Sequence, residues 1–286
     1  MEFWLVTTDH LTDRIWFRDD EDFKAGMNLV ALLVCILGVD VLAFELMSNH
    51  VHFVLHCTRE QAQRFIDGYK KRYSQYLNDK YGSKEFLRRV AVDIRLIDGM
   101  NESLERVVAY VQMNCVAARI CLNPAGYPWG TGKAFFKVTP VKGRRVDTLS
   151  GRARRLLMHS THPLPPHWLV GEDGYILPES YVNVQLVETV FRTPQRMNYF
   201  LQHSSKAKRR LEAEDSTPSF KDQLVRSAIP DLCQSLFRKT NQNDLSEDEQ
   251  AELLKQLRFR FSSNVHQLSR VAGLSYENAA LLLDKV

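Results

Sequence analysis

The sequence predicts an α+β protein in which a small antiparallel sheet is covered by helices and is followed by a mainly helical C-terminal region. Three observations predict this fold class. Strand-like and helix-like patterns alternate over residues 3–121, a short polar turn joins two apolar runs, and helical periodicity dominates from residue 183 onward. Interleaved strands and helices of this kind are typical of a layered fold built around one hydrophobic core.

Candidate elements follow one another closely in the first half of the chain. β-branched and aromatic runs predict strands at 3–8, 39–46, 51–57 and 90–97, and apolar spacing predicts helices at 19–37, 59–81 and 101–121. Gly38 and Gly82 directly follow the first two helices, as expected for helix ends. The turn Ser48–Asn49 is too short for a parallel crossover, so we expect the strands that it joins to pair antiparallel.

The pattern of residues along the sequence changes after residue 123, which indicates further domains. We expect a first domain over 1–135, a basic and Pro-rich connecting segment over 136–182, and a helical domain over 183–286. Within the last of these, 265–271 and 275–285 are two helical patterns separated by Ala272-Gly273-Leu274, a candidate helix-turn-helix. A purely structural helical hairpin is the alternative for this pair.

Composition places the chain among ordinary globular proteins. Of its 286 residues 44% are hydrophobic and 25% are charged, and 38 Lys and Arg against 34 Asp and Glu give a formal net charge of +4. The five cysteines form no C-x-x-C pair, and the longest apolar run, at 27–38, is too short to span a bilayer. Since no signal peptide is recognisable either, we expect a cytoplasmic protein without a membrane partner.

Two histidines form the sharpest local motif. His50 and His52 flank Val51 in a predicted strand, and residues i and i+2 of a strand face the same side. Two neighbouring imidazoles can supply two of the ligands of a metal ion. The alternative is a pair of histidines that are simply packed or solvated. His56 shares the same face further along and is interpreted as a bystander.

A second motif lies in the predicted helix 101–121. Tyr110 and Asn114 stand at i and i+4, hence on one helix face, whereas Gln112 points elsewhere. Facing a metal ion, the tyrosine hydroxyl could act as a nucleophile and the asparagine amide oxygen as a third ligand. Taken alone, a tyrosine at the edge of an amphipathic helix is the plainer interpretation.

Together the two motifs resemble a known family. The run MSNHVHFVL, residues 47–55, resembles the His-hydrophobic-His (HUH) strand of single-tyrosine transposases, and 93–129 resembles their tyrosine helix and its exit. The REP-associated tyrosine transposases are the most similar branch. The chain departs from the family pattern beside the motif: Cys115 stands where proline is usual, Ala118 and Arg119 stand near the usual Ala-Gly, and Gly126 precedes Tyr127-Pro128-Trp129.

The resemblance implies a ferredoxin-like or RRM-like nuclease core of four to five antiparallel strands, with the histidines on a central strand and the tyrosine helix laid across it. It implies a divalent metal, Mg²⁺ or Mn²⁺, held by His50, His52 and Asn114. Imidazole ligands suit Mn²⁺ better than Mg²⁺. Tyr110 would attack a phosphodiester of single-stranded or hairpin DNA from a repeat-like element and form a 5′-phosphotyrosine. Monomer and homodimer both stay open.

Basic residues provide candidate contacts to DNA phosphates. Lys70, Lys71 and Arg72 alternate with Tyr69, Tyr73 and Tyr76, which suits a phosphate track with stacking surfaces. Further candidates are Arg144, Arg145, Arg152, Arg154 and Arg155, and the run at 206–210. For each run, a solvated surface is the alternative.

Two rival functions remain at this stage. A domesticated, catalytically inactive, sequence-specific DNA-binding regulator would keep the fold and the basic patches. A hydrolase of small phosphoesters would also use two strand histidines, but it would need further clustered His or Asp ligands, and the sequence shows none. We therefore expect a metal-dependent transposase that cleaves and rejoins DNA strands.

Overall fold

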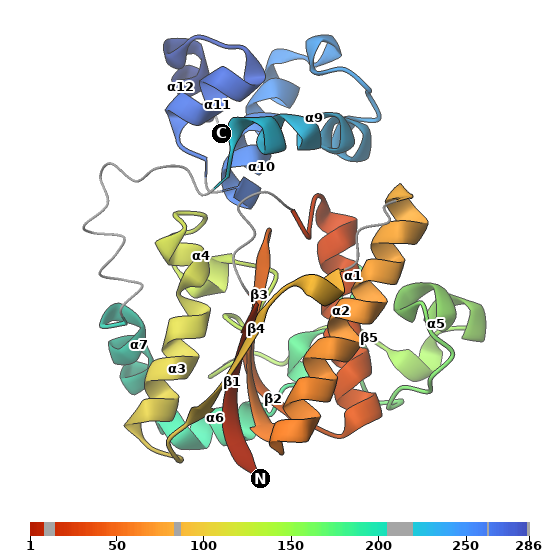
Figure 1. The fold of residues 1–286 in the computed structure, drawn as a ribbon, viewed down its shortest axis with the longest axis vertical. Helices are drawn as coiled ribbons and strands as arrows, with labels where there is room; N and C mark the ends of the chain where they lie inside the picture. Colours follow the sequence, from red (N-terminus) through yellow and green to blue (C-terminus); the bar gives the residue numbers. More distant parts are fainter. Residues whose placement is uncertain (9–14, 83–86, 205–219, 262, 285–286) are drawn as a thin grey trace.

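The computed structural model describes residues 1–8, 15–82, 87–204, 220–261 and 263–284 (Figure 1). A four-stranded antiparallel sheet organises the first half of the chain, as the sequence predicts. Its strands are β1 (Glu2–Thr8), β2 (Asp40–Met47), β3 (His50–Cys57) and β4 (Val92–Ile97), in the order β2-β3-β1-β4. The strand that carries both histidines is therefore central, between β2 and β1.

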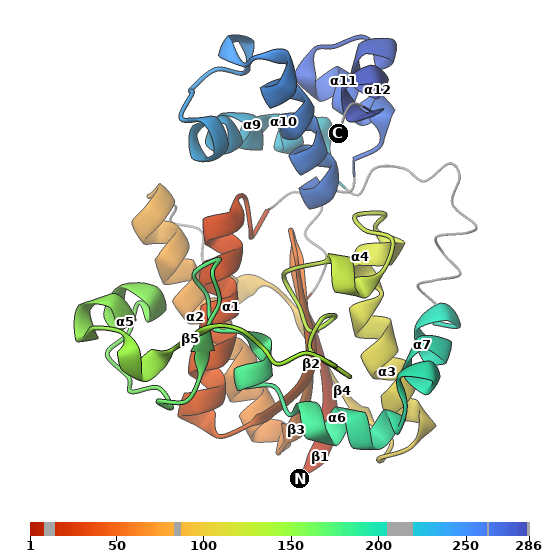
Figure 2. The ribbon, with the colours of Figure 1, turned by 180° about the vertical axis from the view of Figure 1, so that it is seen from behind.

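Helices cover both faces of this sheet (Figures 1 and 2). One face carries α1 (Asp20–Leu37) and α2 (Arg59–Tyr81), and the other carries α3 (Glu102–Gln112) and the short α4 (Asn114–Ala117). Local sequence explains the helix limits. Asp19 caps α1 by accepting the Asp22 N–H, Thr58 and Gln61 form a capping box on α2, and both helices end at a glycine in the left-handed conformation.

One predicted element is wrong in its extent. The helix expected over 101–121 is interrupted at Met113 and ends at Ala117. The reason is local hydrogen bonding: the side-chain amide of Asn114 donates to the carbonyls of Tyr110 and Val111, at 3.1 and 2.9 Å, which satisfies acceptors at the end of α3. The tyrosine and the asparagine thus belong to two consecutive helices.

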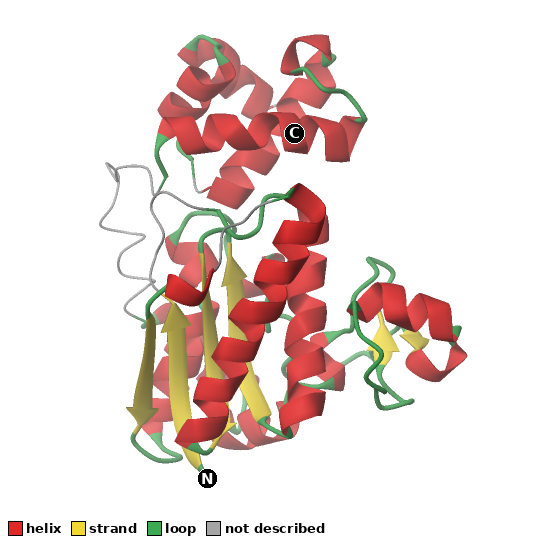
Figure 3. Cartoon of the chain, turned by 45° about the vertical axis from the view of Figure 1, so that its right-hand side comes forward, coloured by secondary structure: helices red, strands yellow, loops and turns green. Residues whose placement is uncertain are grey.

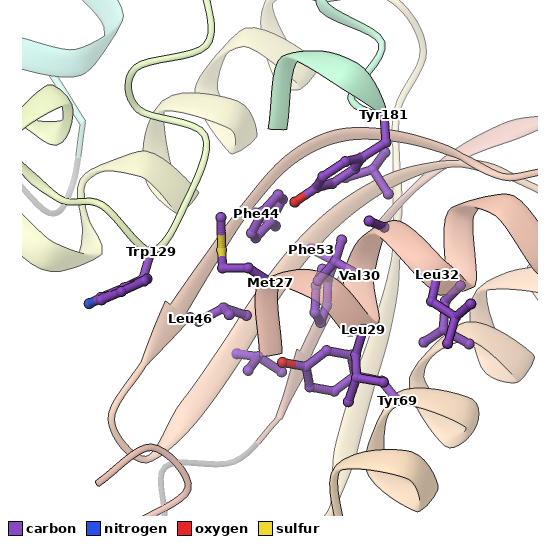
Figure 4. Packing of buried hydrophobic residues seen from close by; sticks show 14 of the residues in the cluster. Met27, Leu29, Val30, Leu32, Phe44, Leu46, Phe53, Tyr69, Trp129 and Tyr181 are labelled. Carbon is purple, nitrogen blue, oxygen red and sulfur yellow. The ribbon is translucent and has the colours of Figure 1, made fainter. Parts of the chain in front are cut away.

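The core between the sheet and the first two helices is strongly aromatic (Figure 4). Phe44 of β2 and Phe53 of β3 point toward α1 and α2, where Met27 and Tyr69 meet them. Phe53 and Tyr69 form an edge-to-face pair with ring centroids 5.4 Å apart. This layer buries large apolar groups and leaves the opposite face of the same strands to other residues.

The chain after α4 returns along the outer edge of β2. Leu46 N–H donates to the Trp129 carbonyl and Thr131 N–H donates to the Phe44 carbonyl, at 2.9 and 3.1 Å. Gly130 is required at this crossing, since a Cβ there would lie 2.8 Å from the Phe44 carbonyl oxygen. The edge of the sheet is thereby covered.

The connecting segment and the next helices pack on opposite sides of the sheet. The short strands β5 (Arg144–Arg145) and β6 (Leu169–Val170) and the helix α5 (Gly151–Met158) lie on the side of α1 (Figure 3). In contrast, α6 (Val184–Phe191) and α7 (Pro194–Gln202) share a core with α3 and the sheet. Short 3₁₀ turns occur at Leu87–Arg89, Pro124–Gly126, Val146–Thr148, Pro178–Ser180 and Gln242–Asp244.

The last four helices have a hydrophobic core of their own. They are α9 (Asp222–Phe237), α10 (Glu247–Phe261), α11 (Val265–Ala272) and α12 (Tyr276–Asp284). The mainly helical C-terminal region is confirmed, and α11 and α12 flank Gly273 as predicted for a helix-turn-helix. No helix among the described residues is long and apolar enough to cross a membrane.

The C-terminal helices contact the N-terminal part through polar groups. The Arg260 guanidinium lies 2.5 Å from Asp20 at the start of α1, and the Arg260 carbonyl accepts the Ser48 hydroxyl. The Arg18 guanidinium approaches Asp231 of α9 at 3.8 Å. The contact therefore reaches the turn that directly precedes His50.

Candidate active site

His50 and His52 occupy the face of β3 that is turned toward α3. Their ring centroids are 4.8 Å apart and the rings are nearly perpendicular. Val51 and Phe53, the alternating residues, belong to the core on the other face. The strand period thus presents both imidazoles on one side, and both side chains are buried, with 6% and 2% of their surface exposed.

The neighbouring Asn49 orients the first histidine. Its side-chain oxygen lies 2.7 Å from Nδ1 of His50. When Nδ1 carries the proton of this hydrogen bond, Nε2 carries the lone pair that a metal ion requires. The asparagine before the first histidine is therefore a positioning residue for the imidazole.

Tyr110 reaches the same region from α3, and Asn114 follows it at the start of α4. The ring centroid of Tyr110 lies 5.9 Å from that of His52, edge to face. Asn114 is buried, and because its amide nitrogen donates to two carbonyls of α3, its amide oxygen is the atom left to act as an acceptor or ligand. The structure thus brings the histidine strand and the tyrosine helix together.

A buried carboxylate joins this group. Glu45 of β2 is the register partner of His52, and its Oε1 accepts the Cys115 N–H at 3.2 Å. Thr7 of β1 is the register partner of His52 on the other side. His52 therefore has Glu45 and Thr7 beside it across the sheet. A carboxylate within the apolar strand VLAFELM is the signal that marks Glu45 in the sequence.

His50 and His52 of β3 and Asn114 of α4 carry donor types that divalent cations accept. Among the described residues, no group of three or more His, Cys, Asp or Glu side chains forms a metal site. Two imidazoles and one amide oxygen are a set of nitrogen and oxygen ligands that suits Mn²⁺ better than Mg²⁺. A cation held in this way would keep open positions for water or phosphate oxygens.

A cavity of about 390 Å³ opens beside Tyr110. The side chains that give it its chemistry are Thr7, Arg95, Arg106, Tyr110, Phe200 and His203. They come from β1, β4, α3 and the end of α7, and α7 lies alongside α3 in Figures 1 and 2. The sequence motifs did not indicate the two arginines or His203, because these residues are far apart in the chain and follow no pattern.

Comparison with known proteins gives a family for part of this region. Residues 17–91 match the family model described as "Transposase IS200 like", a range that includes both histidines and ends before the tyrosine. This part of the chain is similar to the IS200-like transposases. The transposase resemblance inferred from the histidine motif at 47–55 is thereby confirmed, and the match does not extend to residues 93–129.

A distant similarity to one solved structure accompanies this match. A REP-associated tyrosine transposase bound to a REP hairpin shares 11% identity, with a TM-score of 0.35, over 46% of this chain and 76% of the other. A likeness at this level is too weak to support any statement about substrate. No curated protein sequence matches the chain.

Departures from the usual transposase pattern have visible local effects in this chain. Cys115 stands where proline is usual, and its backbone N–H, which a proline lacks, donates to Glu45. Arg119, near the usual glycine, has φ of 59°, the left-handed conformation that glycine adopts most readily. Neither departure lies among the residues that face His52.

The structure separates the predicted DNA-binding residues into different environments. Lys70 is buried, with its ammonium donating to the Val90 carbonyl at 3.1 Å, so it does not present its charge on the surface. Tyr69 and Tyr73 lie in the core, and the prediction that they stack on bases is wrong for this reason. Tyr76 is half-buried and its hydroxyl donates to Asp22.

The remaining basic residues lie on the side of the sheet away from Tyr110. Lys71 is exposed and Arg72 half-buried on α2. The exposed side chains of Arg144, Arg145, Arg152, Arg154 and Arg155 belong to β5 and α5, which pack on the side of α1 (Figures 1 and 3). The run at 206–210 lies outside the described residues. A DNA path that reaches both regions would have to pass around the sheet.

Proposed function

We propose that this chain is a transposase that cleaves and rejoins single-stranded or hairpin DNA through a covalent 5′-phosphotyrosine at Tyr110. The observation that supports this proposal most directly is the edge-to-face contact between Tyr110 and His52, which joins the tyrosine helix to the histidine strand. A cavity with two arginines adjoins the same tyrosine. This arrangement suits the approach of a phosphodiester to a nucleophile.

The proposed reaction is a transesterification. The hydroxyl oxygen of Tyr110 forms a bond to phosphorus, the bond from phosphorus to the 3′-oxygen breaks, the phenol proton passes to solvent, and the leaving oxygen takes up a proton. Because one phosphodiester replaces another, a second 3′-hydroxyl can reverse the step without an external energy source.

His50, His52 and Asn114 are the proposed ligands of a divalent cation. Such a cation would act as a Lewis acid on the non-bridging phosphate oxygens. Asn49 holds the first imidazole through Nδ1. Asn114 is held by the two carbonyls of α3, which fixes its amide oxygen relative to Tyr110.

Burial argues against other tyrosines as the nucleophile. Tyr69, Tyr73 and Tyr127 are almost fully buried, and burial raises the pKa of each hydroxyl well above its usual value. The Tyr127 hydroxyl also donates to the Leu46 carbonyl at 2.6 Å. Tyr110 is only half-buried and lines a cavity, so a phosphate can reach it.

The test is a search for a covalent protein–DNA adduct. The full chain is incubated with labelled hairpin and single-stranded oligonucleotides and Mn²⁺, with chelator as a second arm, and the modified peptide is located by mass spectrometry. We expect the adduct at Tyr110, its loss in Tyr110→Phe, and its retention in Tyr199→Phe, an exposed tyrosine of α7. An adduct at another tyrosine would refute the site assignment.

Ligation by Asn114 is tested separately. We expect Asn114→Ala to weaken Mn²⁺ binding and cleavage together, with partial rescue at high Mn²⁺, because one of three ligands is lost. Gln112→Ala, a neighbouring residue of α3, is the control and should leave Mn²⁺ affinity unchanged. Equal Mn²⁺ affinity in the wild type and Asn114→Ala would remove this residue from the site.

A catalytically inactive DNA-binding regulator is the second candidate, and the helix-turn-helix pattern of α11 and α12 is the observation that favours it. The same assay separates the two functions. A regulator would bind DNA without forming an adduct under any metal condition, whereas a transposase would form one that depends on Tyr110.

A further inference from the structure

We propose that the cavity beside Tyr110 binds the single-stranded nucleotide next to the scissile phosphate, and so selects which phosphodiester is cleaved. This inference rests on the proposed function. It assigns a role to Arg95, Arg106 and His203, to which the sequence motifs gave no role and which lie outside the range matched by the family model.

The position of the cavity makes it an extension of the active site. Thr7, which lines it, pairs with His52 in the register of β1 and β3. Tyr110 lines it from α3. A strand whose phosphate lies at the tyrosine hydroxyl would therefore place an adjoining nucleotide in this cavity. Its volume of about 390 Å³ falls in the range of roughly 300–1,000 Å³ typical of small-ligand sites.

The charge of the cavity suits a phosphate. Its described lining contains Arg95 and Arg106 and no acidic side chain. Arg106 pairs with Glu102 at 2.9 Å, and Arg95 pairs with Asp93, but all four side chains are largely exposed. Exposed pairs of this kind are weak, so either guanidinium can exchange its carboxylate for a phosphate at small cost.

The opposite wall offers the exposed His203 ring to a base. Phe200 also lines this wall but is buried, with its ring 5.8 Å from the Arg106 guanidinium carbon. The His203 ring stacks on Tyr199 with centroids 4.3 Å apart, and its Nδ1 lies 2.7 Å from the Tyr199 carbonyl. Aromatic rings fixed in this way are typical stacking platforms for unpaired bases.

An ion pair between a partly exposed arginine and a buried glutamate joins α7 to α3 at this wall. Arg196 of α7 contacts both carboxylate oxygens of Glu105 on α3, at 2.5 and 2.7 Å, and Glu105 is buried. Paired contacts between guanidinium and carboxylate are geometrically specific. The cavity is therefore formed before DNA arrives, which reduces the entropy lost on binding.

The experiment measures binding of single-stranded oligonucleotides to the full chain carrying Tyr110→Phe, in chelator, so that no cleavage occurs. Arg106→Gln and His203→Ala alter exposed side chains and should keep the fold, which thermal unfolding checks. Arg64→Gln, an exposed arginine of α2, is the matched control on the other side of the sheet. We expect about a tenfold loss of affinity for each cavity variant and less than about twofold for the control.

Two further measurements identify the ligand. Arg106→Gln should reduce the slope of log affinity against log salt by about 0.7, the value for one lost phosphate contact on a single strand. An abasic site stepped along the oligonucleotide should weaken binding to the wild-type cavity at one position, and His203→Ala should abolish that dependence. Inorganic phosphate as a competitor should act only at high concentration.

The outcomes separate this inference from the proposed function. Equal affinity of the cavity variants, or a larger loss in Arg64→Gln, would overturn the inference. Loss of affinity without any effect of the abasic position would overturn the nucleotide assignment and leave only a phosphate contact. Because binding is measured without metal and without Tyr110, a positive result here with no adduct in the cleavage assay would instead refute the catalytic proposal.

Discussion

The two faces of the central sheet differ in what they are built from. Toward α1 and α2, the strands contribute large apolar side chains such as Phe44 and Phe53. Toward α3, the same strands contribute Thr7, Glu45 and the two histidines. Alternation along each strand places these sets one residue apart, so neighbours in sequence serve opposite layers.

This difference shows how the fold can carry a polar, buried site. Burying an imidazole or a carboxylate is unfavourable unless hydrogen bonds compensate for lost water. Here the hydrogen bonds run from His50 Nδ1 to the Asn49 side-chain oxygen and from the Cys115 N–H to Glu45. The apolar layer on the other face supplies the stability that such a site does not.

The largest expected effect tests the polar face. We predict that His52→Ala reduces DNA cleavage at least about a thousandfold, because a metal ligand that provides several kcal/mol in the transition state is lost. The free energy of unfolding should change by less than about 1 kcal/mol, since the imidazole contributes little apolar burial. Cleavage rates and urea unfolding measure the two quantities. Cleavage at the wild-type rate would exclude His52 from the site.

The adjacent residue tests the apolar face. We predict that Phe53→Ala lowers the free energy of unfolding by about 3–5 kcal/mol, because the ring is fully buried against Phe65 and Tyr69. Urea unfolding measures this loss, and Mn²⁺ affinity in the fraction that remains folded should be unchanged. A stable Phe53→Ala chain with impaired metal binding would break the division between the faces.

The extent to which the sequence predicted this arrangement depends on the range of the interactions. The strands, the first two helices and the shared face of His50 and His52 follow from periodicity and capping residues, which are local. The interruption at Met113 depends on a side-chain amide returning to the backbone, which periodicity does not encode. The burial of Lys70 depends on Val90, which approaches it only in three dimensions.

The same limit applies to the candidate site. The sequence indicated His50 and His52 because they are two residues apart in a predicted strand. It indicated Tyr110 and Asn114 because they are four residues apart in a predicted helix. Glu45, Arg95 and Arg106 join the region through sheet register and helix packing, which pair residues from separate parts of the chain. The basic residues of α5 are the opposite case. Their charge predicted contacts to DNA, but the fold places these side chains on the side of the sheet away from Tyr110.

A smaller effect is expected where the C-terminal helices dock at the end of the sheet. The Arg260 side chain is fully buried, and among the described residues its Nε and Nη1 have no hydrogen-bond partner. We predict that Asp20→Asn destabilises the docked C-terminal helices by about 1–3 kcal/mol, because the buried guanidinium loses its carboxylate. Hydrogen exchange in α10 measures this. Glu21→Gln, an exposed residue in the same turn, is the control, and an equal effect would contradict the prediction.

The smallest effect concerns the exit of the tyrosine helix on the polar face. After α4 the chain turns back through hydrogen bonds from Ile120 N–H to the Cys115 carbonyl and from Arg119 N–H to the Val116 carbonyl, at 2.9 and 3.0 Å. This is the pattern of a Schellman motif, with Arg119 at the left-handed position, φ 59°.

A side chain at position 119 costs about 1–2 kcal/mol in this conformation. Glycine avoids that strain but loses more entropy on folding, so we predict that Arg119→Gly stabilises the chain by about 0.5–1 kcal/mol. Arg119→Ala keeps the Cβ and should give no gain, which makes it the matched control for urea unfolding. Since the exposed Arg119 side chain is remote from the residues that face His52, cleavage should be unchanged in both variants. An alanine variant more stable than the glycine variant would show that the turn relaxes out of the left-handed conformation, and the polar face would then be less rigid than the apolar one.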